Sequence, residues 1–77
     1  LGTLCVEGEL IGVKLAASGH AYFSIRDQDA ALPAAMWRSA LSRARVRLAD
    51  GVVVRCFGKF GVFAAQGRLQ FYVDRVE

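Results

Sequence analysis

The sequence predicts an all-β fold, a five-stranded barrel with one short helix, and three observations support this prediction. Apolar and polar residues alternate along five segments, and this period-two alternation is typical of half-buried strands. Residues that favour turns, such as Gly and Asp, separate most of these segments. The segment between the third and fourth strands instead suits a short helix. The 77 residues are expected to form a single domain, 1–77.

The first two predicted strands form a hairpin around Ser18-Gly19. The alternation is clear from Leu4 to Leu10 and weaker from Ile11 to Ala17. Gly19 can supply the positive φ that a tight reversal requires. The next strand runs from His20 to Asp27. Its inner face is expected to carry Ala21, Phe23 and Ile25, and its outer face His20, Tyr22, Ser24 and Arg26.

The third predicted strand runs from Ala31 to Trp37 and follows a polar turn. Its inner side holds Leu32, Ala34 and Met36, so its outer side holds Ala35 and Trp37. Pro33 has no backbone N–H to donate and therefore indicates a sheet edge or a bulge.

A short helix is expected after the third strand. The Ser39 hydroxyl can cap this helix by accepting a hydrogen bond from an amide of the first turn. Leu41 and Ala44 would face the barrel, while Arg43 and Arg47 would remain in water. A tight turn at Asp50-Gly51 then ends this connection.

Two further strands complete the barrel. The fourth is long, and Gly58 in its middle suggests a bulge. A turn over 64–67 leads to the fifth strand. The predicted inward residues of these two strands are Val52, Val54, Cys56, Gly58, Phe60 and Val62, then Leu69, Phe71 and Val73.

Three strands, a helix and two strands is the element order of an OB fold. This barrel binds oligonucleotides or oligosaccharides across its second and third strands and the adjoining loops. A small SH3-like barrel is the competing architecture, and the helix between the third and fourth strands favours the OB fold.

Composition narrows the classes of function. Ten Lys and Arg against seven Asp and Glu leave a net charge of +3, which permits an anionic partner without requiring one. The longest uncharged run, Leu15 to Ile25, is too short to span a membrane, so no membrane partner is expected. No signal peptide is visible, which predicts a cytoplasmic protein. The chain lacks an initiating Met and begins within a predicted strand, so we expect a piece of a longer protein.

The cysteines and the single histidine indicate neither a metal nor another cofactor. Cys5 and Cys56 are too far apart in sequence for a CxxC site, and His20 has no second ligand type nearby. We expect two reduced thiols. The only candidate nucleophile and base are Cys5 or Cys56 with His20, and Cys56 is predicted to point inward. A self-contained enzyme is therefore the least expected function, and no catalytic residues are assigned to this chain.

Particular runs of residues also carry a likeness to a known family. They are Val6-Glu7-Gly8-Glu9-Leu10, the stretch from Ser18 to Asp27, and Met36-Trp37-Arg38. Through them the chain resembles the N-terminal OB domain of the large subunit of exonuclease VII (exodeoxyribonuclease VII). The Ser-Gly-His-x-Tyr-Phe-Ser run is the most specific part. The chain departs from the family at Gly12-Val13-Lys14 and at Ala64-Ala65-Gln66.

The resemblance implies that the parent protein is a nuclease, a hydrolase that degrades single-stranded DNA exonucleolytically in DNA catabolism. It also implies a catalytic region elsewhere in the longer chain and several copies of a small partner subunit. The present chain would then be the part that grips the substrate.

Nine residues are candidates for nucleic-acid binding. Single-strand binding on OB folds combines positive charges along the backbone with aromatic rings on which bases stack. Tyr22 and Trp37 suit stacking, and Arg26 and Arg38 lie beside them. The other candidates are His20, Ser18, Lys14, Lys59 and Arg68.

Structural roles remain open for the same residues. Trp37 could pack under the helix, Tyr22 could brace a loop, and His20 could donate to a phosphate or to the backbone of the loop before it. Phe57, Phe63 and Tyr72 are expected to be covered by another domain rather than to stack on bases. Two other functions stay open: an RNA-binding or tRNA-anticodon-binding OB domain, and a docking barrel that holds other subunits without touching DNA.

Overall fold

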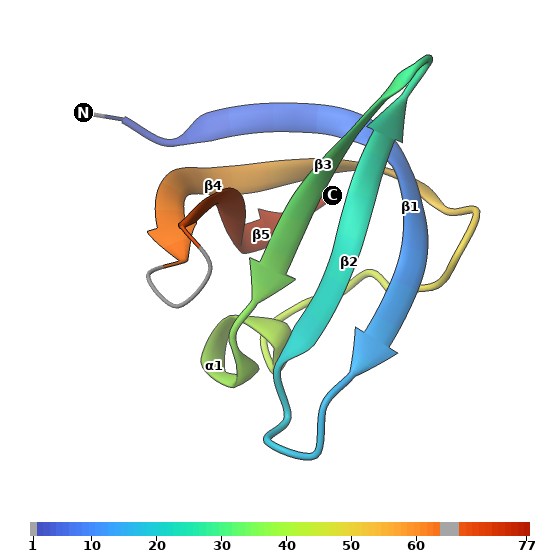
Figure 1. Cartoon of the computed structure of the whole chain (residues 1–77). Helices are drawn as coiled ribbons and strands as arrows, with labels where there is room; N and C mark the ends of the chain where they lie inside the picture. Colours follow the sequence, from blue (N-terminus) through green and yellow to red (C-terminus); the bar gives the residue numbers. More distant parts are fainter. Residues whose placement is uncertain (1, 64–66) are drawn as a thin grey trace.

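The computed structural model describes residues 2–63 and 67–77 as a closed barrel of five strands with one short helix (Figure 1). The elements are β1 (Leu4–Leu15), β2 (Ala21–Asp27), β3 (Ala30–Met36), α1 (Arg38–Leu41), β4 (Val53–Phe63) and β5 (Arg68–Val76). Their order around the barrel is β1-β2-β3-β5-β4, and the helix lies between β3 and β4 in the chain. The predicted fold class is therefore confirmed. Of the turn predicted over 64–67, residues 64–66 lie outside the described residues.

The long strand β1 closes the barrel because it pairs with two neighbours. Its first half pairs with β4 from Leu4 to Glu9, and its second half pairs with β2 from Glu9 to Leu15. Side chains from every strand meet inside, and the largest fully buried ones are Phe71, Leu10, Met36 and Cys56. The inward residues predicted for β2 are all buried: Ala21, Phe23 and Ile25.

Helix α1 covers one end of this core, although Ser39 does not cap it. Ala40 is buried, and Leu41 and Ala44 pack against the core as predicted. The N-cap residue is Trp37, and no side chain of its own caps the helix. Ser39 lies inside the helix, where its carbonyl accepts from Ser42 and from Arg43. The predicted Ser39 cap is therefore wrong, because the helix begins at Arg38, two residues earlier than that role requires.

Gly58 lies where the sheet is irregular, as its sequence position suggested. The pairing of β4 with β5 shifts between Phe57 and Gly58, and Asp74 on β5 is the extra residue. A Cβ at Gly58 would lie 1.9 Å from the carbonyl oxygen of Tyr72. Only glycine permits so close an approach of the two strands.

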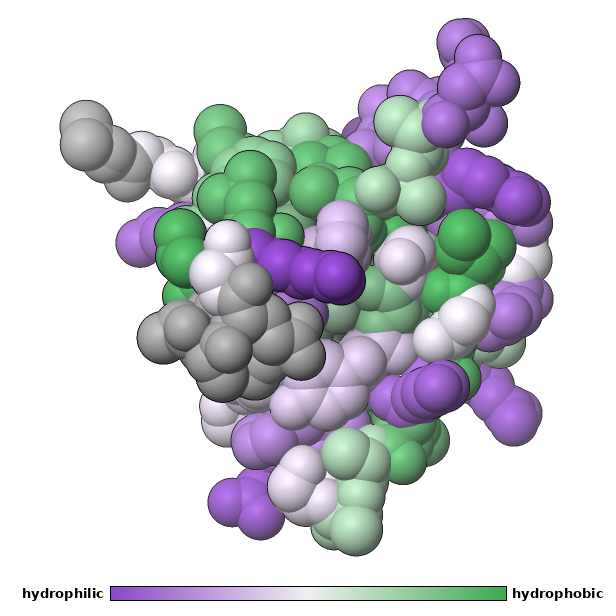
Figure 2. Space-filling view, viewed as in Figure 1, coloured by the Kyte–Doolittle hydropathy of each residue, from purple (hydrophilic) through white to green (hydrophobic). Residues whose placement is uncertain are grey.

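Three residues predicted to face a covered interior are instead exposed: Phe60, Val62 and Leu69. They lie on the end of the β4–β5 hairpin. Within the described residues, β1 pairs with β4 as far as Gly58, and β3 pairs with β5 at Phe71 and Tyr72. The three exposed residues lie outside these paired positions or at their edge. The space-filling view shows hydrophobic side chains gathered between the N-terminal end of the chain and the β2–β3 turn (Figure 2).

The β2–β3 pairing runs through Pro33 without a shift, from Ala21 opposite Met36 to Asp27 opposite Ala30. The bulge alternative for Pro33 is therefore wrong. β5 pairs with β3 only at Ala34 and Ala35. Pro33 lies just outside this paired stretch, in which a backbone N–H would be needed for hydrogen bonds to β5.

The Asp50-Gly51 turn holds an irregular part of β1. The register of β1 against β2 shifts between Ile11 and Lys14. There the Asp50 carboxylate accepts hydrogen bonds from the backbone N–H of Gly12 at 3.0 Å and of Val13 at 2.8 Å. The hydrogen bond from Val13, followed by that from Gly12, lowers the pKa of Asp50 below its ordinary value.

Candidate nucleic-acid interface

One row of residues crosses the outer face of all five strands. The strand registers place Lys14 opposite Tyr22, Tyr22 opposite Ala35, Ala35 opposite Tyr72, and Tyr72 opposite Lys59. Residues directly opposite each other in a ladder carry their side chains on the same face. We call these five residues the transverse row. It has a lysine at each end, a tyrosine inside each lysine, and an alanine at its centre.

Trp37 lies over the centre of the transverse row. It follows Ala35 by two positions, and its indole ring contacts both tyrosines, with ring centroids 6.3 Å from Tyr22 and 5.3 Å from Tyr72. Ala35 is consequently 1% exposed although it faces outward. Ala35 therefore lies on the outer face of β3 as predicted, and the rings around it exclude water.

Tyr22 and Trp37 point outward, as the alternation along β2 and β3 predicts. Tyr22 is 37% exposed and Trp37 is 41% exposed, whereas their neighbours Ala21 and Met36 are fully buried. The strand itself ends at Met36, one residue earlier than predicted. Two large rings that remain partly in water next to one another form a surface on which planar groups can stack.

His20 fixes the position of the chain next to Trp37. Its Nδ1 atom accepts a hydrogen bond of 2.9 Å from the backbone N–H of Arg38, the first residue of α1. The imidazole also meets the Trp37 indole edge-on, with ring centroids 4.8 Å apart. The hydrogen bond that the structure gives the imidazole is thus accepted from the helix start, because α1 begins directly beside His20.

Arg38 connects α1 to the turn between β1 and β2. Its guanidinium donates to the carbonyl of Ser18 at 3.4 Å. Its side chain also lies along Gly19, where an added Cβ would come within 2.9 Å of Cδ. Gly19 has a φ of 92°, so the turn predicted at Ser18-Gly19 is confirmed. We call the rings of Tyr22, Trp37 and Tyr72 the aromatic cluster. The structure thus brings Ser18, His20 and Arg38 together at one end of this cluster.

Tyr72 belongs to this cluster, although the sequence indicated a covered residue. Gly61 lies beneath its ring, and a Cβ at that position would come within 2.7 Å of Cε2 of Tyr72. Alternation along β5 already placed Tyr72 outward. The missing information was that β5 lies parallel to β3, which brings Tyr72 next to Ala35 and Trp37.

Two predicted arginines lie away from the cluster. Arg26 lies four positions along β2 from Tyr22, and its guanidinium forms an ion pair of 2.9 Å with Glu9. Arg68 is exposed at the start of β5, opposite Phe63. Lys14 and Lys59, by contrast, flank the two tyrosines directly. The positive charge next to the rings therefore comes from these lysines and from Arg38.

Across 2–63 and 67–77, no three His, Cys, Asp or Glu side chains come close enough together to hold a metal ion. No helix in this described part of the chain has the length and apolar character needed to cross a membrane.

Sequence comparison relates this chain to exodeoxyribonuclease 7 large subunits. The chain is 38% identical over 76 residues to the exodeoxyribonuclease 7 large subunit of Rickettsia akari (strain Hartford), a match that covers 99% of this chain and 17% of that protein. It is 39% identical over 72 residues to the exodeoxyribonuclease 7 large subunit of Stutzerimonas stutzeri (strain A1501), covering 94% of this chain and 16% of that protein. The chain thus spans a small part of these relatives.

Solved structures show the same fold at low identity. The SSB domain of a Synechococcus sp. protein superposes with a TM-score of 0.63 at 12% identity, over 100% of this chain and 91% of that chain. The priB protein of Ralstonia solanacearum superposes with a TM-score of 0.55 at 20% identity, over 100% and 97% of the two chains. The family model for the OB-fold nucleic acid binding domain matches residues 1–77 of this sequence, and the chain therefore belongs to that family.

Proposed function

We propose that this domain binds single-stranded DNA, with bases stacked on Tyr22, Trp37 and Tyr72 and phosphates near Lys14, Lys59 and Arg38. One observation carries the proposal: the transverse row presents two tyrosines between two lysines, with a tryptophan over its centre. Stacking on aromatic rings tolerates any base, and lysine charges follow a backbone of any sequence. This combination suits a single strand better than a duplex, whose bases are already stacked.

The names of the relatives favour DNA over RNA. Both are exodeoxyribonuclease large subunits that match almost the whole of this chain. We infer that the domain is the substrate-gripping module of a similar cytoplasmic nuclease. In that case the catalytic region and the small subunit lie outside these residues, and the domain holds the strand that the catalytic region degrades.

A fluorescence titration tests the proposal. Trp37 is the single tryptophan, so its emission reports directly on stacking at the centre of the row. Oligo-dT should quench this emission. Trp37→Ala, followed by anisotropy of a labelled oligonucleotide, should cost about 1–3 kcal/mol of binding free energy. Circular dichroism should show an intact barrel, because the indole lies outside the core.

The matched control is Phe57→Ala, which removes a ring from the outer face of β4 next to Arg75, away from the cluster. It should bind oligo-dT as the wild type does. Equal losses in the two variants would contradict the proposed interface. Tighter binding of oligo-U than of oligo-dT would favour the RNA-binding alternative, and binding of neither would favour a docking barrel.

A further inference from the structure

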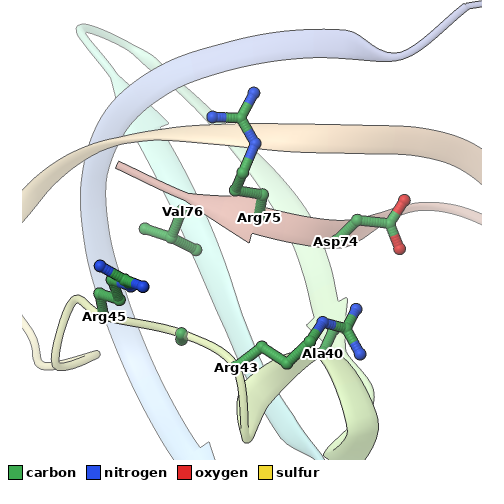
Figure 3. Close-up of a pocket in the computed structure, with 7 residues that line it drawn as sticks. Ala40, Arg43, Arg45, Asp74, Arg75 and Val76 are labelled. Atoms are coloured by element: carbon green, nitrogen blue, oxygen red, sulfur yellow. The ribbon is translucent and has the colours of Figure 1, made fainter.

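A groove separate from the aromatic cluster lies between α1 and the end of β5. It has a volume of about 410 Å³ and is lined by Ala40, Arg43, Ala44, Arg45, Asp74, Arg75 and Val76. In the close-up, Arg43 and Arg45 extend from the connection that follows α1, and the residues of β5 form the opposite wall (Figure 3). The small side chains of Ala40 and Ala44 leave the groove open between these walls.

The charges along this groove favour an anion. The guanidinium of Arg75 points away from α1 (Figure 3). It pairs with Glu77 and lies 4.0 Å from the centre of the Phe57 ring. Arg43 uses one N–H to reach the Ser39 carbonyl at 3.0 Å, and a guanidinium has further donors to offer. Asp74 is the one carboxylate in the lining, set against Arg43 and Arg45.

The two walls of the groove continue from two rings of the interface. Trp37 immediately precedes α1, and its carbonyl accepts the N–H of Leu41 in the first helical turn. Tyr72 lies two residues before Asp74 on β5. On both segments the Trp37–Tyr72 contact therefore lies just before the residues that line the groove, and a strand that runs past this contact between α1 and β5 would continue into the groove.

We propose that the groove binds the phosphodiester backbone of the same single strand beyond the stacked bases, through Arg43 and Arg45. This inference rests on the proposed function and extends it, since it makes the bound segment longer than the aromatic cluster alone can hold. Arginine suits this role because its planar donors match phosphate oxygens. Asp74 also lines the groove and repels an anion, so the two arginines must offset its charge.

Oligonucleotide length provides the test. Oligo-dT of about 4 nucleotides should fit on the rings alone, and oligo-dT of about 12 nucleotides should also reach the groove, both lengths being within the usual range of OB sites. The double variant Arg43→Gln/Arg45→Gln should bind the longer strand at least several-fold more weakly. Its salt slope should fall by about 1.4, or about 0.7 for each lost phosphate contact. Its affinity for the short strand should not change.

The matched control is Arg47→Gln/Arg55→Gln, which removes the same charge from exposed positions outside the groove. This control should leave the salt slope unchanged at both lengths. The inference is overturned if the groove variant weakens both lengths equally, or if the control has the same effect as the groove variant. The proposed function fails separately, if the wild-type chain binds neither strand or if Trp37→Ala binds both normally.

Discussion

The indole ring of Trp37 lies against the phenol ring of Tyr72, with ring centroids 5.3 Å apart and planes inclined by 36°. The two rings are far apart in sequence, and the parallel pairing of β3 with β5 joins them. This pairing includes only Ala34 with Phe71 and Ala35 with Tyr72. The central part of the proposed interface therefore depends on one short contact between strands.

Gly61→Ala tests the position of the Tyr72 ring without removing the ring. The added Cβ would come within 2.7 Å of Cε2, so the ring must move from its place beside Trp37. We expect binding of oligo-dT, measured by anisotropy, to weaken by up to about 3 kcal/mol, the upper value for one stacked base. Gly2→Ala is the matched control, because nothing lies within 4 Å of its added Cβ. Normal affinity in Gly61→Ala would show that the ring position is irrelevant to binding.

His20→Ala should loosen Trp37. The variant loses the acceptor for the Arg38 N–H and the edge contact with the indole. The lost hydrogen bond should lower the free energy of unfolding by about 0.5–1.5 kcal/mol. Steady-state anisotropy of the tryptophan emission should fall as the ring gains motion. His20→Asn keeps an acceptor near the place of Nδ1 and should recover part of both values. No recovery would show that the hydrogen bond does not hold this ring.

Asp50→Asn should change how stability depends on pH. In the folded chain the hydrogen bonds from Val13 and Gly12 hold the pKa of Asp50 below 3.8. A depressed pKa of a carboxyl stabilises the fold above its unfolded pKa, and this contribution is lost as the pH falls through the folded value. The variant should therefore melt at a lower temperature than wild type at pH 7. The difference should shrink below pH 3.8.

The control for this experiment is Asp29→Asn, in the exposed turn between β2 and β3. It should leave the melting temperature unchanged over the same pH range. A difference between Asp50→Asn and wild type that stays constant from pH 7 to pH 2 would contradict the assigned role of the carboxylate charge.

The two thiols should react at very different rates. Cys5 is exposed and Cys56 is buried, and neither forms a disulfide. Burial, followed by the proximity of Cys5, raises the pKa of Cys56 to about 11. A thiol reagent such as DTNB should modify one cysteine quickly in the folded protein and the second only after unfolding. Cys5→Ser should abolish the fast phase. A fast phase that persists would show that Cys56 is accessible.

The sequence by itself determined the strands and the faces of β2. Neighbouring side chains in a strand point to opposite sides, so the pattern of β2 alone separates buried Phe23 and Ile25 from exposed Tyr22 and Arg26. The same local rule placed Trp37 outward and Cys56 inward. Each of these predictions needed only the residues next to it in the chain.

Only the tertiary structure decided which outward residues lie together and where the interior ends. Tyr72 joins Trp37 because β5 lies beside β3, and Phe60 is exposed although alternation along β4 places it on the inner side. His20 accepts from the start of α1 because the helix begins beside the β1–β2 turn. Alternation gives the face of a residue within its own strand, whereas these relationships depend on which strands are neighbours and on how far they pair. Those are properties of the closed barrel, which no single segment encodes.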